Sequence, residues 1–281
     1  MNSVCSFMAN QEKPNPLYHF PEYYDIIFAR DVSVELEFLL GLFKLHRHRP
    51  LQSYLDLGCG PGYYARGMAD RGIESIGLDC CQEMIDFARA AAAREQLRID
   101  FRTGDMRNFE IDKPIDLAAC LFDSIDGMLS LDDFVAHFRA VASNLRADGL
   151  YVIGQMHQRD TPIIGYGPFH YRAERDGKEV ALDWATDVKI ETLTQTADVS
   201  LELRVKENGQ VKVMQHRTRE SFITPPFLTA AARLSGVLEP FTWYGDYDLQ
   251  QPYDDTENSI HCISIFRKTN PGREGEGDGN T

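Results

Sequence analysis

The chain has 281 residues, 43% of them hydrophobic, which is enough apolar material for one large domain or two modest ones. Its 43 acidic residues outnumber 29 basic ones and give a net charge of −14, which disfavours tRNA, rRNA or DNA as a substrate because proteins that bind nucleic acids normally present a basic patch. The six cysteines show no paired framework or metal-ligand spacing, and no apolar run suits a signal peptide or a membrane span, so we expect a cytoplasmic protein with reduced thiols.

Strands and helices are predicted to alternate along most of the chain. In chain order we expect a helix over residues 22–45, a strand over 53–57, a helix over 63–71, a strand over 74–79, a helix over 81–95, strands over 99–103 and 115–122, a helix over 131–145 and a strand over 150–156. A helix over 224–235 and strands over 237–244 and 259–267 follow later. This alternation predicts an α/β fold with a doubly wound, mostly parallel, seven-stranded sheet.

The pattern changes after Met156. Runs over 166–175, 178–189, 191–206 and 210–218 resemble strands, and Asp176-Gly177 and Asn208-Gly209 are strong hairpin turns between them. We therefore expect an inserted antiparallel sheet over residues 157–218, which divides a main domain formed by 1–156 and 219–268. Residues 269–281 are rich in Gly and contain no apolar side chain, so we expect them to be disordered.

The first strand leads directly into a glycine-rich turn. Residues 54–62 read Tyr-Leu-Asp-Leu-Gly-Cys-Gly-Pro-Gly, and glycines at alternate positions let backbone approach a ligand closely. Asp79 ends the second strand about 20 residues after the loop, the spacing expected of an acid that binds a ribose. Asp105 and Asp123 follow the third and fourth strands in the same way. Together these strand ends predict one nucleoside-binding site.

The loop also discriminates between nucleoside ligands. A dinucleotide site is expected to read G-x-G-x-x-G, whereas this loop reads D-x-G-x-G-x-G, with an acid, Asp56, inside the motif. A charged Asp56 repels a pyrophosphate and attracts a sulfonium, which favours S-adenosylmethionine. A nicotinamide-dependent oxidoreductase is the less favoured alternative. A non-catalytic protein that binds adenosylmethionine, or a regulatory partner, stays open.

These motifs resemble those of class I S-adenosylmethionine-dependent methyltransferases, which have a Rossmann-like fold, and the resemblance extends over residues 23–268. Residues 56–62 match the first motif of that family, residues 77–79 with 84–89 match the second, and residues 104–107 match the adenine-binding motif. Tyr24-Asp25 and the runs at 120–125 and 244–247 resemble a small-molecule branch that includes glycine N-methyltransferase-like and amino-sugar N,N-dimethyltransferase enzymes.

The resemblance implies roles for individual residues. It implies that Asp79 binds the ribose hydroxyls, that Asp105 and the Met106 backbone bind the adenine, and that Arg30 faces the carboxylate of the cofactor while Tyr24 faces the methyl. The full set that it places at the cofactor is Tyr24, Arg30, Asp56, Gly58, Cys59, Gly60, Asp79, Cys80, Met84, Asp105, Met106, Leu121 and Phe122. Gly127 stands where the amino-sugar enzymes carry a catalytic His, so that role does not transfer.

The inserted sheet is expected to cover the methyl and to hold a small-molecule acceptor, methylated on an amine nitrogen or on a hydroxyl or carboxyl oxygen. Tyr24 and Asp126 are predicted to orient that acceptor, with neither assigned as a general base. Further candidates for the acceptor cavity are Tyr18, His157, Tyr166, His170, Trp184, His216, Arg219, Tyr244 and Asp246. His46, His48 and His137 are expected on helix surfaces. Neither a metal nor a nucleic-acid or membrane partner is expected, and a homodimer is left open.

Overall fold

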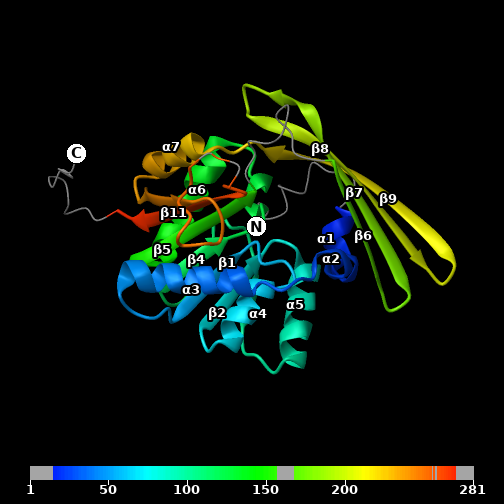
Figure 1. Ribbon diagram of the computed structural model, residues 1–281, viewed down its shortest axis with the longest axis horizontal. Coiled ribbons are helices and arrows are strands. Elements are labelled where there is room, and N and C mark those ends of the chain that lie inside the picture. Colours follow the sequence, from blue (N-terminus) through cyan, green and yellow to red (C-terminus); the bar gives the residue numbers. More distant parts are fainter. Residues whose placement is uncertain (1–14, 157–167, 255, 257, 270–281) are drawn as a thin grey trace.

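The computed structural model describes residues 15–156, 168–254, 256 and 258–269 (Figure 1). Its central element is a seven-stranded sheet with the strand order β10-β11-β5-β4-β1-β2-β3. The strands are β1 (Ser53–Leu57), β2 (Glu74–Asp79), β3 (Asp100–Thr103), β4 (Ile115–Cys120), β5 (Leu145–Met156), β10 (Leu238–Tyr244) and β11 (His261–Lys268). Only β11 runs antiparallel to its two neighbours, β5 and β10. The predicted mostly parallel α/β sheet is confirmed.

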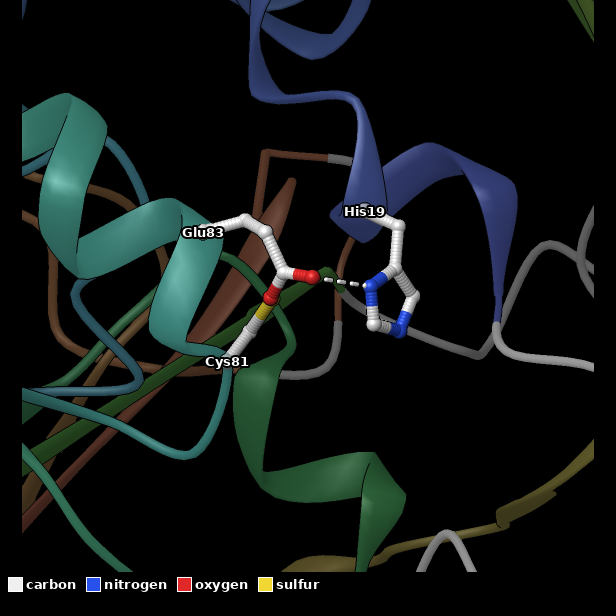
Figure 2. Close-up of side chains that lie close together, drawn as sticks. All are labelled: His19, Cys81 and Glu83. Carbon is white, nitrogen blue, oxygen red and sulfur yellow. Dashed lines mark hydrogen bonds and ion pairs between the residues drawn. The ribbon is translucent and has the colours of Figure 1, made fainter.

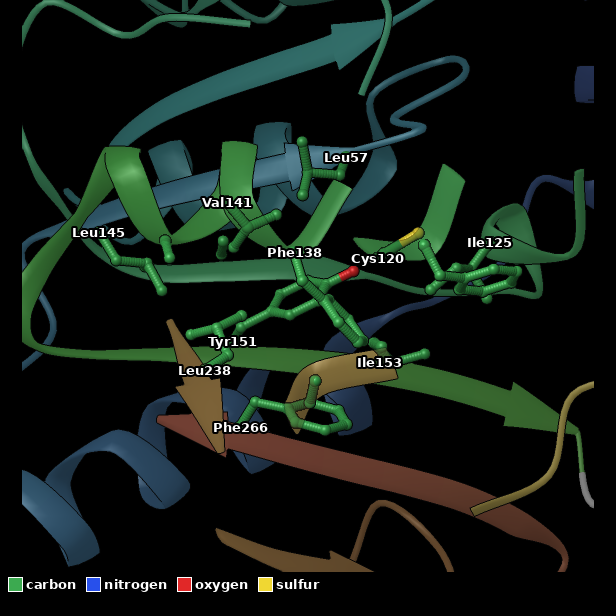
Figure 3. Close-up of a cluster of buried hydrophobic side chains, with 14 of the residues drawn as sticks. Leu57, Cys120, Ile125, Phe138, Val141, Leu145, Tyr151, Ile153, Leu238 and Phe266 are labelled. Atoms are coloured by element: carbon green, nitrogen blue, oxygen red, sulfur yellow. The ribbon is translucent and has the colours of Figure 1, made fainter. Parts of the chain in front are cut away.

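Helices cover both faces of this sheet. They are α3 (Ser33–Arg47), α4 (Tyr63–Asp70), α5 (Gln82–Arg94), α6 (Leu131–Asn144) and α7 (Pro225–Ser235). Along β4, Leu117 and Ala119 pack with side chains of α3 and α4, whereas Ala118 and Cys120 pack with those of α6 and α7. Figure 3 shows the second of these clusters around Phe138 and Tyr151. Burial on both faces explains why the central strands are apolar at consecutive positions.

A separate four-stranded antiparallel sheet has the order β6-β7-β8-β9. Its strands are β6 (Phe169–Arg175), β7 (Lys178–Glu191), β8 (Thr196–Glu207) and β9 (Gln210–Ser221). Trp184, Leu201 and His216 lie opposite one another in the strand register and therefore share one side of the sheet, which we call the inner face. The inner face packs against the short helices α1 (Pro16–His19) and α2 (Pro21–Phe28), which lie between it and the main sheet (Figure 1).

The main differences from the predicted element boundaries lie at the N-terminal helix, at β5 and in the small sheet. The predicted helix over 22–45 is two helices, because the Asp31 carboxylate accepts a hydrogen bond from the Ser33 N–H at 2.9 Å and so competes with the helical backbone pattern. Strand β5 begins at Leu145 and not at the predicted residue 150, and Asp148-Gly149 lies within an irregular stretch of its pairing with β4. β8 begins at Thr196 and β9 extends to Ser221, past the predicted limit at 218.

Candidate active site

The glycine loop lies where the strand order reverses. β1 pairs with β2 on one side and β4 on the other, and ligands of open α/β sheets bind at the carboxyl ends of strands at such a point. Gly58, Gly60 and Gly62 all have positive φ, at 68°, 50° and 77°. A Cβ on Gly58 would lie 2.7 Å from Ser124 Cβ and 3.6 Å from Met106 Cε, so the loop meets the segments after β3 and β4. The predicted strand ends therefore converge.

Asp79 connects the glycine loop to the start of α5. One carboxylate oxygen accepts a hydrogen bond from the Gly60 N–H at 2.8 Å, and the other accepts one from the Cys81 N–H at 2.8 Å. Each oxygen retains a second lone pair, so the carboxylate can still accept bonds from two ribose hydroxyls. A Cβ placed on Gly60 would have no atom within 4 Å, so the space beside the loop is open. This geometry fits the ribose role, which stays a prediction.

Asp56 lies deeper than the sequence argument assumed. Its side chain is 1% exposed and accepts a hydrogen bond from the Ala65 N–H in the first turn of α4. Burial raises the pKa of Asp56 to about 8, so the carboxyl is largely protonated at neutral pH. Its charge is therefore not what separates a sulfonium from a pyrophosphate. Of the neighbouring predicted contacts, Cys59 and Met84 are buried and Cys80 is exposed.

Asp105 occupies the turn after β3, half-buried and already paired with a cation. The Arg107 guanidinium donates to its carboxylate at 2.6 Å and also to Asp133 at 2.6 Å. Burial alone would raise the pKa of Asp105, but the hydrogen bonds from Arg107 hold it below its usual value. The carboxylate therefore stays ionised and held in place, as an acceptor for an amino group requires.

His137 contacts the same turn through the Met106 carbonyl, and the expectation that it lies on a helix surface is wrong. Its ring is 0% exposed, with Nδ1 2.8 Å from the Met106 carbonyl and Nε2 2.5 Å from the Tyr151 hydroxyl. Because a carbonyl only accepts, Nδ1 carries the proton and Nε2 accepts from Tyr151. Burial lowers the pKa of His137 to about 4, so the ring is neutral. His48 is exposed, as expected, and His46 is half-buried beside Tyr244.

The N-terminal helices carry Tyr24 and lead into Arg30, the two residues predicted to reach over the cofactor. The Arg30 guanidinium donates to the Tyr64 hydroxyl at 2.6 Å and lies 4.3 Å from the centre of the Phe122 ring. Burial raises the pKa of Tyr24; Arg30 opposes this shift, while Asp79 and Asp123 add to it. Tyr24 is therefore a neutral phenol that lies within electrostatic reach of both strand-end acids.

The segment after β4 is strained. Phe122 and Asp123 have φ values of 56° and 58°, a left-handed conformation that residues other than glycine adopt at a cost. The Asp123 carboxylate accepts a hydrogen bond from the Met156 N–H at 2.9 Å, which holds the turn in place. Leu121 is buried, whereas Phe122 is 40% exposed with its ring against Phe28. Such strain is typical of functional sites.

Side-chain contacts join helix α1 to the start of α5 (Figure 2). His19 Nδ1 lies 2.6 Å from a Glu83 carboxylate oxygen, and Cys81 Sγ lies 3.3 Å from the other oxygen and 3.4 Å from the Tyr18 carbonyl. These are residue types that bind metals, and their ligand atoms lie within 4.8 Å of one another. Burial raises the pKa of Cys81 to about 12, so the side chain is a neutral thiol, and the three groups are satisfied by mutual hydrogen bonds.

The acceptor candidates do not all come together. Tyr18, Tyr24 and Trp184 belong to the apolar cluster between α1, α2 and the small sheet, and His216 lies on its inner face. His170 and Arg219 lie on the opposite face, paired with Asp183 and Asp198, so the prediction is wrong for them. Asp126 is 2% exposed and is hydrogen-bonded to Gln155. Tyr244 packs against Phe38, and Asp246 forms an ion pair with His261. His157 and Tyr166 lie outside the described residues.

Residues 55–149 match the family model of a methyltransferase domain. The dTDP-3-amino-3,6-dideoxy-alpha-D-glucopyranose N,N-dimethyltransferase of Streptomyces fradiae is 29% identical over 47% of this chain and 51% of its own length. The ubiquinone biosynthesis O-methyltransferase of Rickettsia typhi is 25% identical over 47% of this chain and 52% of its own length. A solved S-adenosylmethionine-dependent methyltransferase of Clostridium acetobutylicum has a TM-score of 0.71 and 17% identity, covering 90% of this chain and 99% of that one.

Residues 55–149 are a methyltransferase domain, and the chain has the fold of solved S-adenosylmethionine-dependent methyltransferases. The resemblance predicted from the motifs is confirmed, although the chain spans about half the length of the curated relatives it matches. S-adenosylmethionine is the cofactor that the domain family and the fold indicate, as predicted. The residues predicted to bind this cofactor are placed suitably for it: Gly60 borders open space, Asp79 has free lone pairs, and Arg30 lies beside the segment after β4.

Proposed function

We propose that this methyltransferase transfers a methyl group from S-adenosylmethionine to a small molecule, on an amine nitrogen or on a hydroxyl or carboxyl oxygen. The observation that carries the proposal is the position of Tyr24. It packs in the apolar cluster against Tyr171 and Trp184 of the small sheet, and the carboxylates of Asp79, at the predicted ribose site, and of Asp123 both add to its raised pKa. Tyr24 therefore stands between the cofactor side and the acceptor side of one site.

The cofactor, when bound, supplies a methyl group on a sulfonium, which a nucleophile takes by in-line displacement. Such a reaction depends on alignment and on exclusion of water. Tyr24, Phe28 and Phe122 supply aromatic walls for this, with ring centres 4.7 Å apart for Tyr24–Phe28 and 5.7 Å apart for Phe28–Phe122. Tyr24 and Asp126 remain our candidates for orienting the acceptor. The buried Asp126 acts there through Gln155, which donates to it at 2.9 Å.

Two observations bear on the chemical nature of the acceptor. The relatives named above are an N,N-dimethyltransferase of a dTDP-amino sugar and an O-methyltransferase of ubiquinone biosynthesis, so both nitrogen and oxygen acceptors stay within the proposal. The net charge of −14 supports a small molecule rather than a nucleic acid. Among the described residues, no helix is long and apolar enough to cross a bilayer. We further propose a cytoplasmic location and leave a homodimer open.

Calorimetry and a turnover assay test this function. We expect S-adenosylmethionine and S-adenosylhomocysteine to bind in the micromolar range and NAD to show no binding, and we expect S-adenosylhomocysteine to accumulate when a suitable amine or hydroxyl acceptor is added. Tight binding of NAD without binding of S-adenosylmethionine would refute the assignment. Binding of the cofactor without turnover on a broad panel of amines and alcohols would favour a non-catalytic binding protein.

A further inference from the structure

Glu220, near the end of β9, was not singled out from the sequence. It lies opposite Ala197 in the strand register, four residues beyond His216 on the same strand, so its side chain is on the inner face of the small sheet. The neighbouring Arg219 points to the other face, where it pairs with Asp198 and Glu191. Across the described part of the chain, no cation forms an ion pair with Glu220.

A second acid, Asp123, lies in the segment after β4, which contacts the end of β9. Ser221 donates a hydrogen bond to the Met128 carbonyl, which joins the end of β9 to the segment that follows β4. The carboxylate of Asp123, in that segment, is close enough to raise the pKa of Glu220 after burial has done so, and the resulting pKa is about 7. Glu220 in turn raises the pKa of Tyr18, and the Asp79 carboxylate raises it as well. Glu220 therefore acts electrostatically on Tyr18 and Asp123 on Tyr24, the two tyrosines of the N-terminal helices.

Two neutral polar groups on the inner face lack partners. His216 is 7% exposed, and its Nε2 is buried without a hydrogen bond among the residues that the structure describes. Thr186 Oγ1, on β7, is buried and unbonded in the same sense. Burial lowers the pKa of His216, so its ring is neutral and Nε2 can donate or accept. Buried polar atoms are almost always bonded, so these two indicate a polar molecule that binds on this face.

We propose that Glu220 and Asp123 bind the ammonium group of an amine acceptor and that Glu220 takes a proton from it. This inference rests on the proposed methyltransferase function and selects nitrogen over oxygen as the methylated atom. Two carboxyl groups that form no ion pair with the described residues, in a partly buried site, favour a cation between them, and a small ammonium ion supplies several N–H donors for both. His216 and Thr186 are then available to other polar groups of the same molecule.

The proton step makes the nitrogen a nucleophile. One N–H bond of the ammonium breaks, an O–H bond forms on Glu220, and the electron pair left on nitrogen is free to form the N–CH₃ bond as the bond between that methyl and sulfur breaks, with the electron pair of that bond left on sulfur. The proton then leaves Glu220 to water, which restores the carboxylate. Among the residues that the structure describes, the titratable groups that interact electrostatically with Glu220 are Asp123 from the segment after β4 and Tyr18 from α1, and His216 lies on the same face of its own strand. A pKa near 7 lies closer to that of an amine than an ordinary carboxyl does, which makes the transfer less unfavourable.

A matched pair of probes tests the ammonium site. Cyclohexylamine and cyclohexanol have the same ring and differ in carrying an ammonium or a hydroxyl group. In the full chain saturated with S-adenosylhomocysteine at pH 8, we expect cyclohexylamine to bind at least tenfold more tightly than cyclohexanol. Glu220→Gln should abolish this preference, whereas Glu179→Gln, an exposed acid on the outer face, should retain it. Equal binding of the probes to the wild type, or a preference that survives Glu220→Gln, overturns the proposal.

A second measurement tests the pair without any acceptor. The pKa of Glu220 can be followed by NMR of carboxyl-labelled glutamate, and Asp123→Asn should lower it, because burial and then the Asp123 carboxylate raise it. Asn tolerates the left-handed backbone of position 123 and retains an oxygen for the Met156 N–H. An unchanged pKa of Glu220 refutes the pairing. Affinity for S-adenosylhomocysteine is measured on the same samples, so loss of the cofactor, which would refute the proposed function itself, is distinguished from loss of the ammonium site alone.

Discussion

Replacing Asp79 by Ala should weaken cofactor binding strongly while leaving the protein folded. A hydrogen bond to a charged group contributes about 1.5–3 kcal/mol, and about 1.4 kcal/mol corresponds to a tenfold change in affinity. If the carboxylate binds even one ribose hydroxyl, the Kd for S-adenosylhomocysteine should rise at least tenfold in Asp79→Ala. The Gly60 and Cys81 N–H groups also lose their acceptor, at about 1–3 kcal/mol each, offset in part because a buried carboxylate no longer has to be desolvated. The net loss is smaller than a typical unfolding free energy of about 5–15 kcal/mol.

Calorimetric titration with S-adenosylhomocysteine, combined with thermal unfolding, measures both effects. Asp86→Ala, on the exposed side of α5, is the matched control and should retain wild-type affinity. An analogue without the ribose hydroxyls separates direct contact from loosening of the glycine loop: it should bind the wild type weakly and Asp79→Ala no worse. Unchanged affinity of Asp79→Ala for S-adenosylhomocysteine would show that the end of β2 is not the ribose site.

Three further outcomes are expected. His137→Ala should lower the free energy of unfolding by about 2–4 kcal/mol, because it opens a cavity and leaves the Met106 carbonyl and the Tyr151 hydroxyl unpaired, and denaturant titration at pH 7 measures this; a loss below about 1 kcal/mol would contradict it. Trp184→Ala should alter the acceptor KM or kcat with cofactor affinity near wild type, whereas Tyr24→Phe should affect both ligands; equal loss of cofactor affinity in both would make the small sheet a structural support. Because the folded-state pKa of Glu220, about 7, exceeds its ordinary value of 4.5, the wild type loses stability as pH rises between these values, so Glu220→Gln should unfold at higher temperature than the wild type at pH 8 and show a much smaller difference at pH 5.

The cofactor half of the site could be predicted because it follows a local pattern. An apolar strand that ends in Gly or Asp is visible in a window of ten residues, and in a parallel sheet all such ends lie on one edge. The burial of a polar side chain cannot be seen in so short a window of sequence. Asp56 was assigned a charge that its environment removes, and His137 was placed on a surface although it stands three residues after Phe134 and four before Val141, within the buried stripe of α6. That spacing was the signal that could have located it.

The acceptor half depends on register, which the sequence specifies only once strand pairing is known. Residues 215–221 of β9 are all polar, and nothing in that run indicates whether Arg219 or Glu220 faces the site, because a shift of one residue reverses every side chain. His170 was misplaced for the same reason. The hairpins at Asp176-Gly177 and Asn208-Gly209 were predictable, whereas the third connection, after β7, has no glycine: Gln195 adopts a φ of 54° there.

The wall formed by α1 and α2 has a thermodynamic consequence for the two ligands. Asp79 contributes to the raised pKa values of both Tyr18 and Tyr24, and Glu220 contributes to that of Tyr18 and Asp123 to that of Tyr24. A ligand that binds beside Asp79 therefore changes the electrostatic environment of a ligand that binds beside Glu220 and Asp123. Affinities coupled in this way are reciprocal: whatever factor an amine adds to the retention of S-adenosylhomocysteine, S-adenosylhomocysteine must add to the retention of the amine. Where this coupling is favourable, a methylated product that binds well raises the equilibrium affinity for the spent cofactor, and the spent cofactor raises the affinity for the product.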